Sequence, residues 1–199
     1  MAIRTIIHTQ YWSILQLFYT NHNSPLHLRD ICRKINLRES ATSRHLQALE
    51  RVNILKSHKD ANLKKYSIKK QAIPELFSLF DRDKLEALPL LRKNAIAFYI
   101  DALKEKPIFI ILFGSTAKRT FRDDSDIDLI TVFNKKKNTG DAIKYAEAQT
   151  GIRVNEFQLT YTEFVQELKL KQDNVIQAGI ETGYPVYNQL YFEEIRNNG

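Results

Sequence analysis

The sequence of 199 residues contains a single cysteine, Cys32, and all five of its histidines lie before residue 59. One cysteine cannot form an internal disulfide, and no Cys/His cluster with the spacing of a metal site is visible. No run of eighteen apolar residues is present, and no charged segment precedes an apolar leader with a cleavage site. We therefore expect a cytoplasmic protein that makes no use of a membrane.

Acidic residues are scarce in the first third of the chain. Residues 1–70 contain 13 Lys and Arg against 4 Asp and Glu, a net charge of +9, whereas the remainder contains 17 against 19, a net charge of −2. A chain of this length with 43% hydrophobic residues can form two small domains. The asymmetry favours nucleic acid as the partner of the first third, although a merely soluble basic domain would have the same composition.

Apolar residues recur at helical spacing in three segments of this basic third, which predicts helices over residues 3–20, 28–35 and 40–52. Two strand-like segments follow, residues 54–59 and 63–68, with Asp60-Ala61-Asn62 as a hairpin turn. Three helices followed by a basic hairpin resemble the winged helix-turn-helix of small bacterial and archaeal repressors, over about residues 5–70.

This resemblance implies that the third helix enters the major groove of double-stranded DNA and that the hairpin contacts backbone phosphates. The residues that would face bases are Thr42, Ser43, Arg44 and Gln47. The residues that would face phosphates are Lys56, Lys59, Lys64 and Lys65. Because such modules bind paired half-sites, a homodimer is also expected. The alternative is a protein-interaction module whose lysines form an ordinary solvated face.

The second part of the chain is organised around residues 108–133. Residues 108–113 form an apolar run typical of a buried strand, and Gly114-Ser115 then permits a tight turn. Residues 116–120 have the length of one or two helical turns, with Ser115 or Thr116 available as the N-cap. Because a helix N-terminus presents free N–H groups, this turn is a candidate phosphate site.

Asp126-Ile127-Asp128 leads into a second apolar strand. Side chains alternate along a strand, so Asp126 and Asp128 are expected on one face. Two close carboxylates repel each other unless a cation lies between them, and their hard oxygen atoms suit Mg²⁺ bridged to phosphates. The alternative is that the acids of this stretch form a turn and a solvated strand edge.

An apolar residue, Gly-Ser, a spacer and Asp-x-Asp are the hallmark of minimal polymerase-beta-like nucleotidyltransferases. Residues 86–199 resemble this family through Phe113-Gly114-Ser115 and Asp126-Ile127-Asp128. The resemblance implies that Asp126 and Asp128 are catalytic residues that hold Mg²⁺ or Mn²⁺, and that a third acid on a later strand completes the site. The residues implied to bind a nucleoside triphosphate are Gly114, Ser115, Thr116, Lys118 and Arg119.

The third strand is expected over residues 152–159, and it should carry the third acid. Aligning the pattern places Asn155, which is not an acid, in that position. Glu156 could serve instead if the register shifts by one residue. Because neighbouring strand residues point to opposite faces, only one of the two can reach the site.

We therefore predict an α+β protein with a winged helix over residues 1–70, a linker helix over residues 71–85, and a nucleotidyltransferase-like mixed sheet flanked by helices over residues 86–199. The predicted function is transfer of a nucleoside monophosphate from a Mg²⁺-bound nucleoside triphosphate to an acceptor hydroxyl, coupled to DNA binding. Two alternatives stay open. One is a DNA-binding transcriptional regulator whose degenerate domain senses a nucleotide, and the other is an antitoxin that modifies or binds a small all-helical toxin.

Overall fold

The computed structural model describes residues 10–21 and 24–198, and the chain divides into two compact units between Phe80 and Asp81. The division falls inside helix α5 (Ile73–Glu86), in the segment predicted as a linker helix. Each unit has its own hydrophobic core. No helix among the described residues combines the length and the apolarity that crossing a membrane requires.

The first unit is a winged helix, as predicted. Its helices are α2 (Gln10–Thr20), α3 (Leu28–Ile35) and α4 (Glu39–Arg51). Its antiparallel sheet has the order β1-β3-β2, built from β1 (Leu26–His27), β2 (Leu55–Asp60) and β3 (Leu63–Ile68), and a 3₁₀ turn, η1 (Lys70–Ala72), follows. Residues 3–9 of the predicted first helix lie outside the described residues.

One apolar face of each helix of the first unit packs into a common core. Ile14, Phe18 and Leu46 are almost completely buried there, and Leu55 at the start of β2 joins them. Burying a side chain of this size stabilises a fold by about 1.5–3 kcal/mol. The core therefore fixes which face of α4 points inward and which is left exposed.

The second unit contains a mixed sheet, as predicted, and its strand order is β6-β5-β4-β7. Its strands are β4 (Phe109–Phe113), β5 (Ile127–Phe133), β6 (Val154–Thr160) and β7 (Tyr184–Tyr187), of which only β5 and β6 are parallel among the described strand pairs. Its helices, beyond the end of α5, are α6 (Leu90–Ala102), α7 (Gly114–Lys118), α8 (Gly140–Thr150), α9 (Tyr161–Leu170), α10 (Asn174–Thr182) and α11 (Gln189–Asn198).

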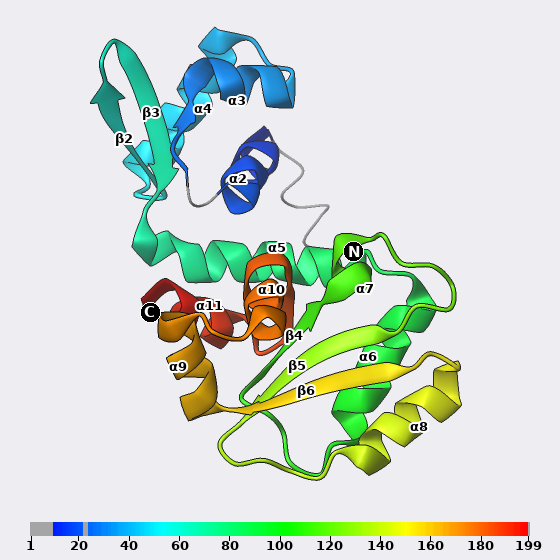
Figure 1. Cartoon of the computed structure of the whole chain (residues 1–199). Coiled ribbons are helices and arrows are strands. Elements are labelled where there is room, and N and C mark those ends of the chain that lie inside the picture. The colour runs from blue at the N-terminus through cyan, green and yellow to red at the C-terminus, as the bar shows by residue number, and fades with distance from the viewer. Residues whose placement is uncertain (1–9, 22–23, 199) are drawn as a thin grey trace. The chain divides into compact units, whose positions relative to one another are not determined.

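Both faces of this sheet are covered by helices. In Figure 1, α6 and α8 lie on one side of the sheet, whereas α9, α10 and α11 lie on the other. Ile110 and Leu112 of β4 belong to the core beneath α6 and α8, and Phe109, Ile111 and Phe113 belong to the opposite core. Because β4 is buried on both faces, its sequence is a continuous apolar run.

The register of the sheet brings three separate segments to one end. Phe113, the last residue of β4, pairs with Asp128 near the start of β5. Asp128 in turn pairs with Asn155 near the start of β6. The turn that follows Phe113 and the first residues of β5 and β6 are therefore neighbours in space.

Candidate functional site

Gly114 and Asp128 lie against each other at this end of the sheet. Gly114 has a φ of +68°, in the left-handed region that glycine adopts without steric cost. A Cβ atom on Gly114 would overlap the Asp128 carboxylate. The position therefore requires glycine twice, once for its backbone conformation and once for the close approach of the carboxylate.

Asp126 immediately precedes β5 and lies beside Arg153, which immediately precedes β6. The Arg153 Nε atom is 2.9 Å from Asp126 Oδ1. Oδ1 is buried, yet it accepts no hydrogen bond from the described residues. Asp126 thus has a charge partner but retains an oxygen with unused lone pairs.

Asn155 occupies the position predicted for a third acid. Its Nδ2 atom donates a hydrogen bond of 3.2 Å to Asp128 Oδ1. The alternative assignment to Glu156 is wrong, because Glu156 is the partner of Leu129 and points to the opposite face of the sheet. There it accepts hydrogen bonds from Tyr99 and Thr139.

The contacts of Glu156 on that opposite face are those of a structural group. The Tyr99 hydroxyl donates to Glu156 Oε1 at 2.5 Å and lies 3.0 Å from the Thr131 hydroxyl. Burial raises the pKa of Tyr99 well above its usual range, and the Glu156 carboxylate raises it further. Tyr99 therefore remains a proton donor to Glu156 at every ordinary pH.

The residues at the end of the sheet fit a hard divalent cation. Asp126 offers a buried oxygen that accepts no hydrogen bond from the described residues, and Asp128 offers a carboxylate held against the backbone of Gly114. Within the described part of the chain, no three His, Cys, Asp or Glu side chains converge. Two carboxylates suit Mg²⁺ or Mn²⁺ that completes its coordination with phosphate oxygens and water, rather than a site made entirely of protein ligands.

The helix after the turn, α7, begins at Gly114, with Phe113 in the N-cap position and no side-chain cap. The prediction that Ser115 or Thr116 caps it is therefore wrong. Thr116 is fully buried, so it presents no surface to a nucleotide in this structure. Its hydroxyl donates to the Asp126 carbonyl at 3.3 Å. Ser115 is half-buried.

Arg92 of α6 is part of this region, and our sequence analysis did not identify it. Its side chain is 3% exposed, donates to Thr116 Oγ1 at 2.9 Å, and donates to the carbonyls of Arg122 and Ser125 at 2.8 and 3.0 Å. Its guanidinium also lies over the Phe121 ring at 4.1 Å. Arg92 thus ties α6 to α7 and to the loop that leads to Asp126.

Burial lowers the pKa of Arg92, and the carboxylates of Asp123 and Asp126 oppose this effect. An arginine retains its charge through such a shift, because its ordinary pKa lies far above neutral pH. The sequence does contain a signal for Arg92, since it interrupts an otherwise buried helical stripe. That stripe consists of Ala95, Ile96 and Tyr99 of α6.

The exposed side of α4 carries part of the predicted DNA-binding set. Arg44 and Gln47 are exposed, and Ser43 is half-buried. Thr42 is fully buried, and its hydroxyl donates to the Arg38 carbonyl at 3.1 Å. The prediction that Thr42 faces a base is wrong, because it lies on the same inward face of the helix as Leu46 and Leu49.

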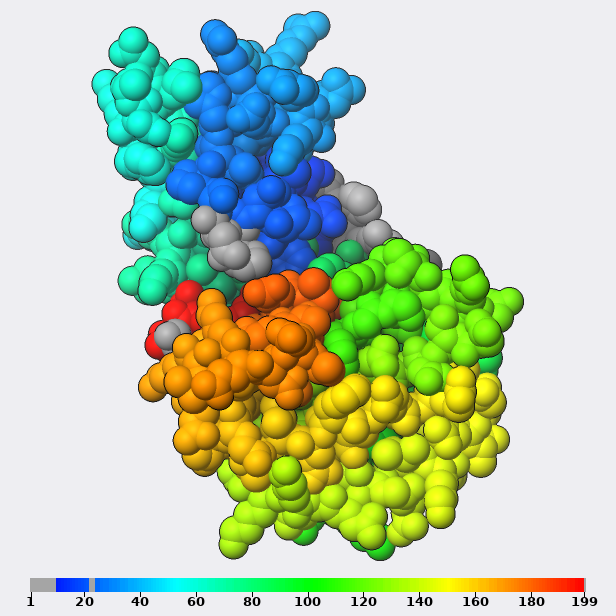
Figure 2. All heavy atoms as spheres, viewed as in Figure 1, coloured from blue at the N-terminus to red at the C-terminus, as the bar shows by residue number. Residues whose placement is uncertain are grey.

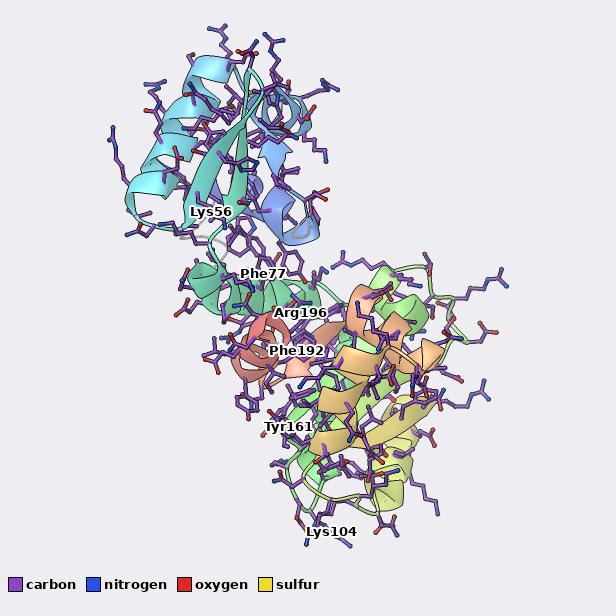
Figure 3. All side chains as sticks on the ribbon, turned by 60° about the vertical axis from the view of Figure 1, so that its left-hand side comes forward. Lys56, Phe77, Lys104, Tyr161, Phe192 and Arg196 are labelled. Carbon is purple, nitrogen blue, oxygen red and sulfur yellow. The ribbon has the colours of Figure 1, made fainter. Side chains whose placement is uncertain are left out.

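The hairpin of β2 and β3 projects from the first unit (Figure 2), and its lysines fall into two groups. Lys64 donates to Glu50 Oε2 at 2.9 Å, and Lys65 donates to Asp60 Oδ2 at 2.5 Å. No ion pair joins Lys56, which Figure 3 labels on the hairpin, or Lys59 to a described residue. Lys56 and Lys59 are both exposed and therefore present their charge to solvent.

Comparison with known proteins gives one family match. Residues 96–189 match the model of the family described as "Polymerase beta, Nucleotidyltransferase". This range contains the Gly114-Ser115 turn, Asp126, Asp128 and Asn155. No protein with a curated description matches the chain.

Three solved structures are similar to this chain, and two of them are transcription regulators. HlyU, a transcriptional regulator from Vibrio vulnificus CMCP6, is 27% identical with a TM-score of 0.31, over 37% of this chain and 74% of HlyU. MepR, a transcription regulator of the Staphylococcus aureus multidrug efflux pump MepA, is 16% identical with a TM-score of 0.35, over 48% of this chain and 77% of MepR. A variant of Lactococcus lactis ZitR is 15% identical with a TM-score of 0.30, over 47% of this chain and 71% of ZitR.

Proposed function

We propose that the protein transfers a nucleoside monophosphate from a Mg²⁺-bound nucleoside triphosphate to an acceptor hydroxyl. The match of residues 96–189 to the polymerase beta nucleotidyltransferase family supports this reaction. We further propose that the winged helix couples this activity to DNA binding. One observation carries the proposal. The Gly114-Ser115 turn, Asp126 and Asp128 meet at one end of the sheet, with an acceptor oxygen of Asp126 left unused by the described residues.

In this proposal Asp126 and Asp128 would hold Mg²⁺ or Mn²⁺, which would polarise the α-phosphate and favour ionisation of the acceptor hydroxyl. Ser115 and the main-chain N–H groups of the turn would bind the phosphates that leave as pyrophosphate. The exposed cations Lys118 and Arg119 lie at the end of α7 and would attract the triphosphate.

The transfer forms a bond between the acceptor oxygen and the α-phosphorus, and it breaks the bond between that phosphorus and the bridging oxygen. The acceptor proton would pass to a carboxylate of the pair or to water. Asn155 would not take it, because a neutral amide is not a base at ordinary pH. Its role would be to orient Asp128 through the hydrogen bond that it donates.

For the first unit we propose binding of double-stranded DNA as a homodimer. Arg44, Gln47 and Ser43 on α4 would approach base edges in the major groove. Lys56 and Lys59 would contact phosphates. The proposal is supported by the exposure of Arg44, Gln47 and the two lysines. It is also supported by the net charge of +9 over residues 1–70, from 13 Lys and Arg against 4 Asp and Glu.

A second candidate function is a DNA-binding regulator that senses a nucleoside triphosphate without turning it over. Asn155 favours this candidate, because it leaves the site with one negative charge fewer than a site with three acids. Such a site would still bind a metal-triphosphate complex through Asp126, Asp128 and the turn.

Incubation of the full chain with each α-labelled nucleoside triphosphate, Mg²⁺ and a cell extract as the source of acceptors separates the two candidates. Transfer of the label with release of pyrophosphate, lost in Asp126→Asn and Asp128→Asn variants, is the result expected of the enzyme. Retention of an intact triphosphate by the protein without release of pyrophosphate supports the sensor. Absence of both would exclude a nucleotide site.

A further inference from the structure

Arg153 introduces a positive charge into the proposed nucleotide site. Its side chain is 75% exposed, and its Nε atom lies 2.9 Å from Asp126 Oδ1. The same oxygen accepts no hydrogen bond from the described residues. The guanidinium therefore offsets the charge of Asp126 without satisfying the lone pairs of its buried oxygen.

A divalent cation at Asp126 would compete with this guanidinium. The two cannot both sit against Oδ1. The ion pair is weak because the Arg153 side chain is 75% exposed, so water and salt screen its charge. The ion pair should therefore be displaced when a divalent cation arrives together with phosphate oxygens, which add ligands and negative charge.

The displaced side chain would have a new partner within reach. Arg153 immediately precedes β6 and Asn155 is its second residue. Asn155 donates a hydrogen bond to the second carboxylate, Asp128. Phosphates bound to a cation between Asp126 and Asp128 would thus lie beside the base of the Arg153 side chain. A guanidinium has planar donors that match two phosphate oxygens at once.

We propose that Arg153 exchanges partners, pairing with Asp126 in the free protein and with the phosphates of the metal-triphosphate complex in the bound protein. The inference rests on the proposed nucleotide site. It assigns a phosphate-binding role to a residue outside the Gly-Ser and Asp-x-Asp motifs. It also gives a reason why this site takes the metal and the triphosphate together, since Arg153 opposes binding of the metal alone and favours binding of the phosphates.

Replacement of Arg153 should shift two affinities in opposite directions. In Arg153→Gln, binding of Mn²⁺ alone should tighten about threefold, the size expected when an exposed ion pair is removed. Binding of inorganic tripolyphosphate with saturating Mg²⁺ should weaken about tenfold, the size expected for loss of a hydrogen bond between charged groups. A residue with only a structural role would shift neither affinity, or would lower both.

Electron paramagnetic resonance measures free Mn²⁺, and calorimetry measures binding of tripolyphosphate, which carries no base and so does not require the nucleotide to be known. The matched control is Lys104→Gln, because Lys104 is also an exposed cation paired with an aspartate, Asp141, at 3.5 Å. Lys104 precedes β4, at the opposite end of that strand from Gly114, and Figure 3 labels it. The control should shift neither affinity.

Arg153→Lys separates charge from shape and also serves if Arg153→Gln is unstable to heat. It keeps the charge, so Mn²⁺ affinity should stay near that of the natural protein, while tripolyphosphate affinity should fall because the planar donors are lost. If the natural protein binds both probes and Arg153→Gln leaves both affinities unchanged or lowers both, the exchange of partners is wrong and the nucleotide site stands. If the natural protein binds neither probe, the proposed nucleotide site is wrong, and this inference with it.

Discussion

The two faces of the sheet in the second unit use polar side chains in opposite ways. Beneath α6 and α8, Glu156 accepts hydrogen bonds from both Tyr99 and Thr139. At the end of the sheet, Asp128 has the Asn155 amide as a donor, and Asp126 Oδ1 has no donor among the described residues. Asn155 and Glu156 are adjacent in sequence, yet they belong to these two different environments. A buried polar group with all its partners holds a fold together, whereas a polar group with unused acceptors can hold a ligand.

Arg92 gives the largest expected effect, because it belongs to the group that holds the fold together. Arg92→Met removes the donors to Thr116 Oγ1 and to two loop carbonyls. We expect the free energy of unfolding of the second unit to fall by about 3–5 kcal/mol, because the Thr116 hydroxyl and the two loop carbonyls lose a charged donor, at about 1–3 kcal/mol for each acceptor left unsatisfied. Urea denaturation followed by circular dichroism measures this loss. Lys144→Met, at an exposed position of α8, is the control and should change stability by less than about 0.5 kcal/mol. A loss below about 1 kcal/mol in Arg92→Met would contradict the structural role of Arg92.

Replacement of Asp128 should lower ligand affinity and leave stability intact, the reverse of what is expected for Arg92. Asp128→Asn removes a proposed metal ligand, so we expect the affinity for a triphosphate in the presence of Mg²⁺ to fall by about a hundredfold. The free energy of unfolding should stay unchanged or rise slightly, because a repulsion between carboxylates is relieved. Calorimetry measures the first quantity and urea denaturation the second.

Glu156→Gln is the matched control for Asp128→Asn, since both exchange a carboxylate for an amide on neighbouring strands. It should lower the free energy of unfolding by about 1–3 kcal/mol, because an amide nitrogen replaces an acceptor of a partly buried hydrogen bond. Triphosphate affinity should be unaffected. If Asp128→Asn and Glu156→Gln changed triphosphate affinity and the free energy of unfolding in the same way, the distinction between the two faces would be wrong.

The sequence was sufficient to predict the strands of the site, but not which side chains reach it. The apolar run of β4 and the Gly114-Ser115 turn are local features, so they could be recognised without knowing the fold. The choice between Asn155 and Glu156 depends on the register between β5 and β6, which is set by packing across the whole sheet.

The wrong predictions for single residues on helices also arise because the sequence does not fix which way a side chain points. Thr42 and Thr116 are polar and lie in the expected segments, but each faces inward, because a shift of helical phase by one residue turns a side chain by about 100°. Arg92 was missed because its role depends on hydrogen-bond acceptors in a loop about thirty residues away in the sequence, which the sequence does not place next to it. The contacts with Arg122 and Ser125 show this.

Glu193 of α11 provides an intermediate case, because it is fully buried and only partly compensated. Arg196, labelled beside Phe192 in Figure 3, donates to Glu193 Oε2 at 2.6 Å. Burial raises the pKa of Glu193 from 4.5 to about 8, Arg196 opposes the rise, and the carboxyl of Asp81 adds to it. The folded chain therefore favours the protonated acid.

A raised pKa in the folded state means that this contribution to stability is fully present below about pH 4.5 and is lost as the pH rises through about 8. Glu193→Gln should remove this loss and should be more stable than the natural protein at pH 9 by about 1–2 kcal/mol. Thermal unfolding between pH 5 and pH 9 measures the difference. Glu194→Gln, at the exposed neighbouring position, should keep the natural pH dependence. Equal slopes in all three proteins would show that Glu193 is not the group responsible.

The smallest expected effect extends the comparison to the first unit, where some lysines have internal partners and others do not. Replacing Lys56 and Lys59 together with Ala should weaken binding of double-stranded DNA about fivefold and reduce the salt dependence by up to about two ion equivalents. Replacing Lys64 and Lys65 should weaken DNA binding less, because each must first break its ion pair, with Glu50 or Asp60 respectively, before it can contact a phosphate. Fluorescence anisotropy of labelled DNA with the full chain over a range of salt measures both. The reverse order, or binding that salt does not affect, would argue against the hairpin as a phosphate contact.

The close approach of Gly114 to Asp128 has a consequence for the entropy of binding. A carboxylate on a free side chain gives up rotational freedom when it takes hold of a ligand, and that loss weakens binding. The Asp128 carboxylate is confined between the backbone of Gly114 and the Asn155 amide before any ligand arrives. Its rotational freedom is therefore lost during folding, and the ligand meets a carboxylate that is already oriented.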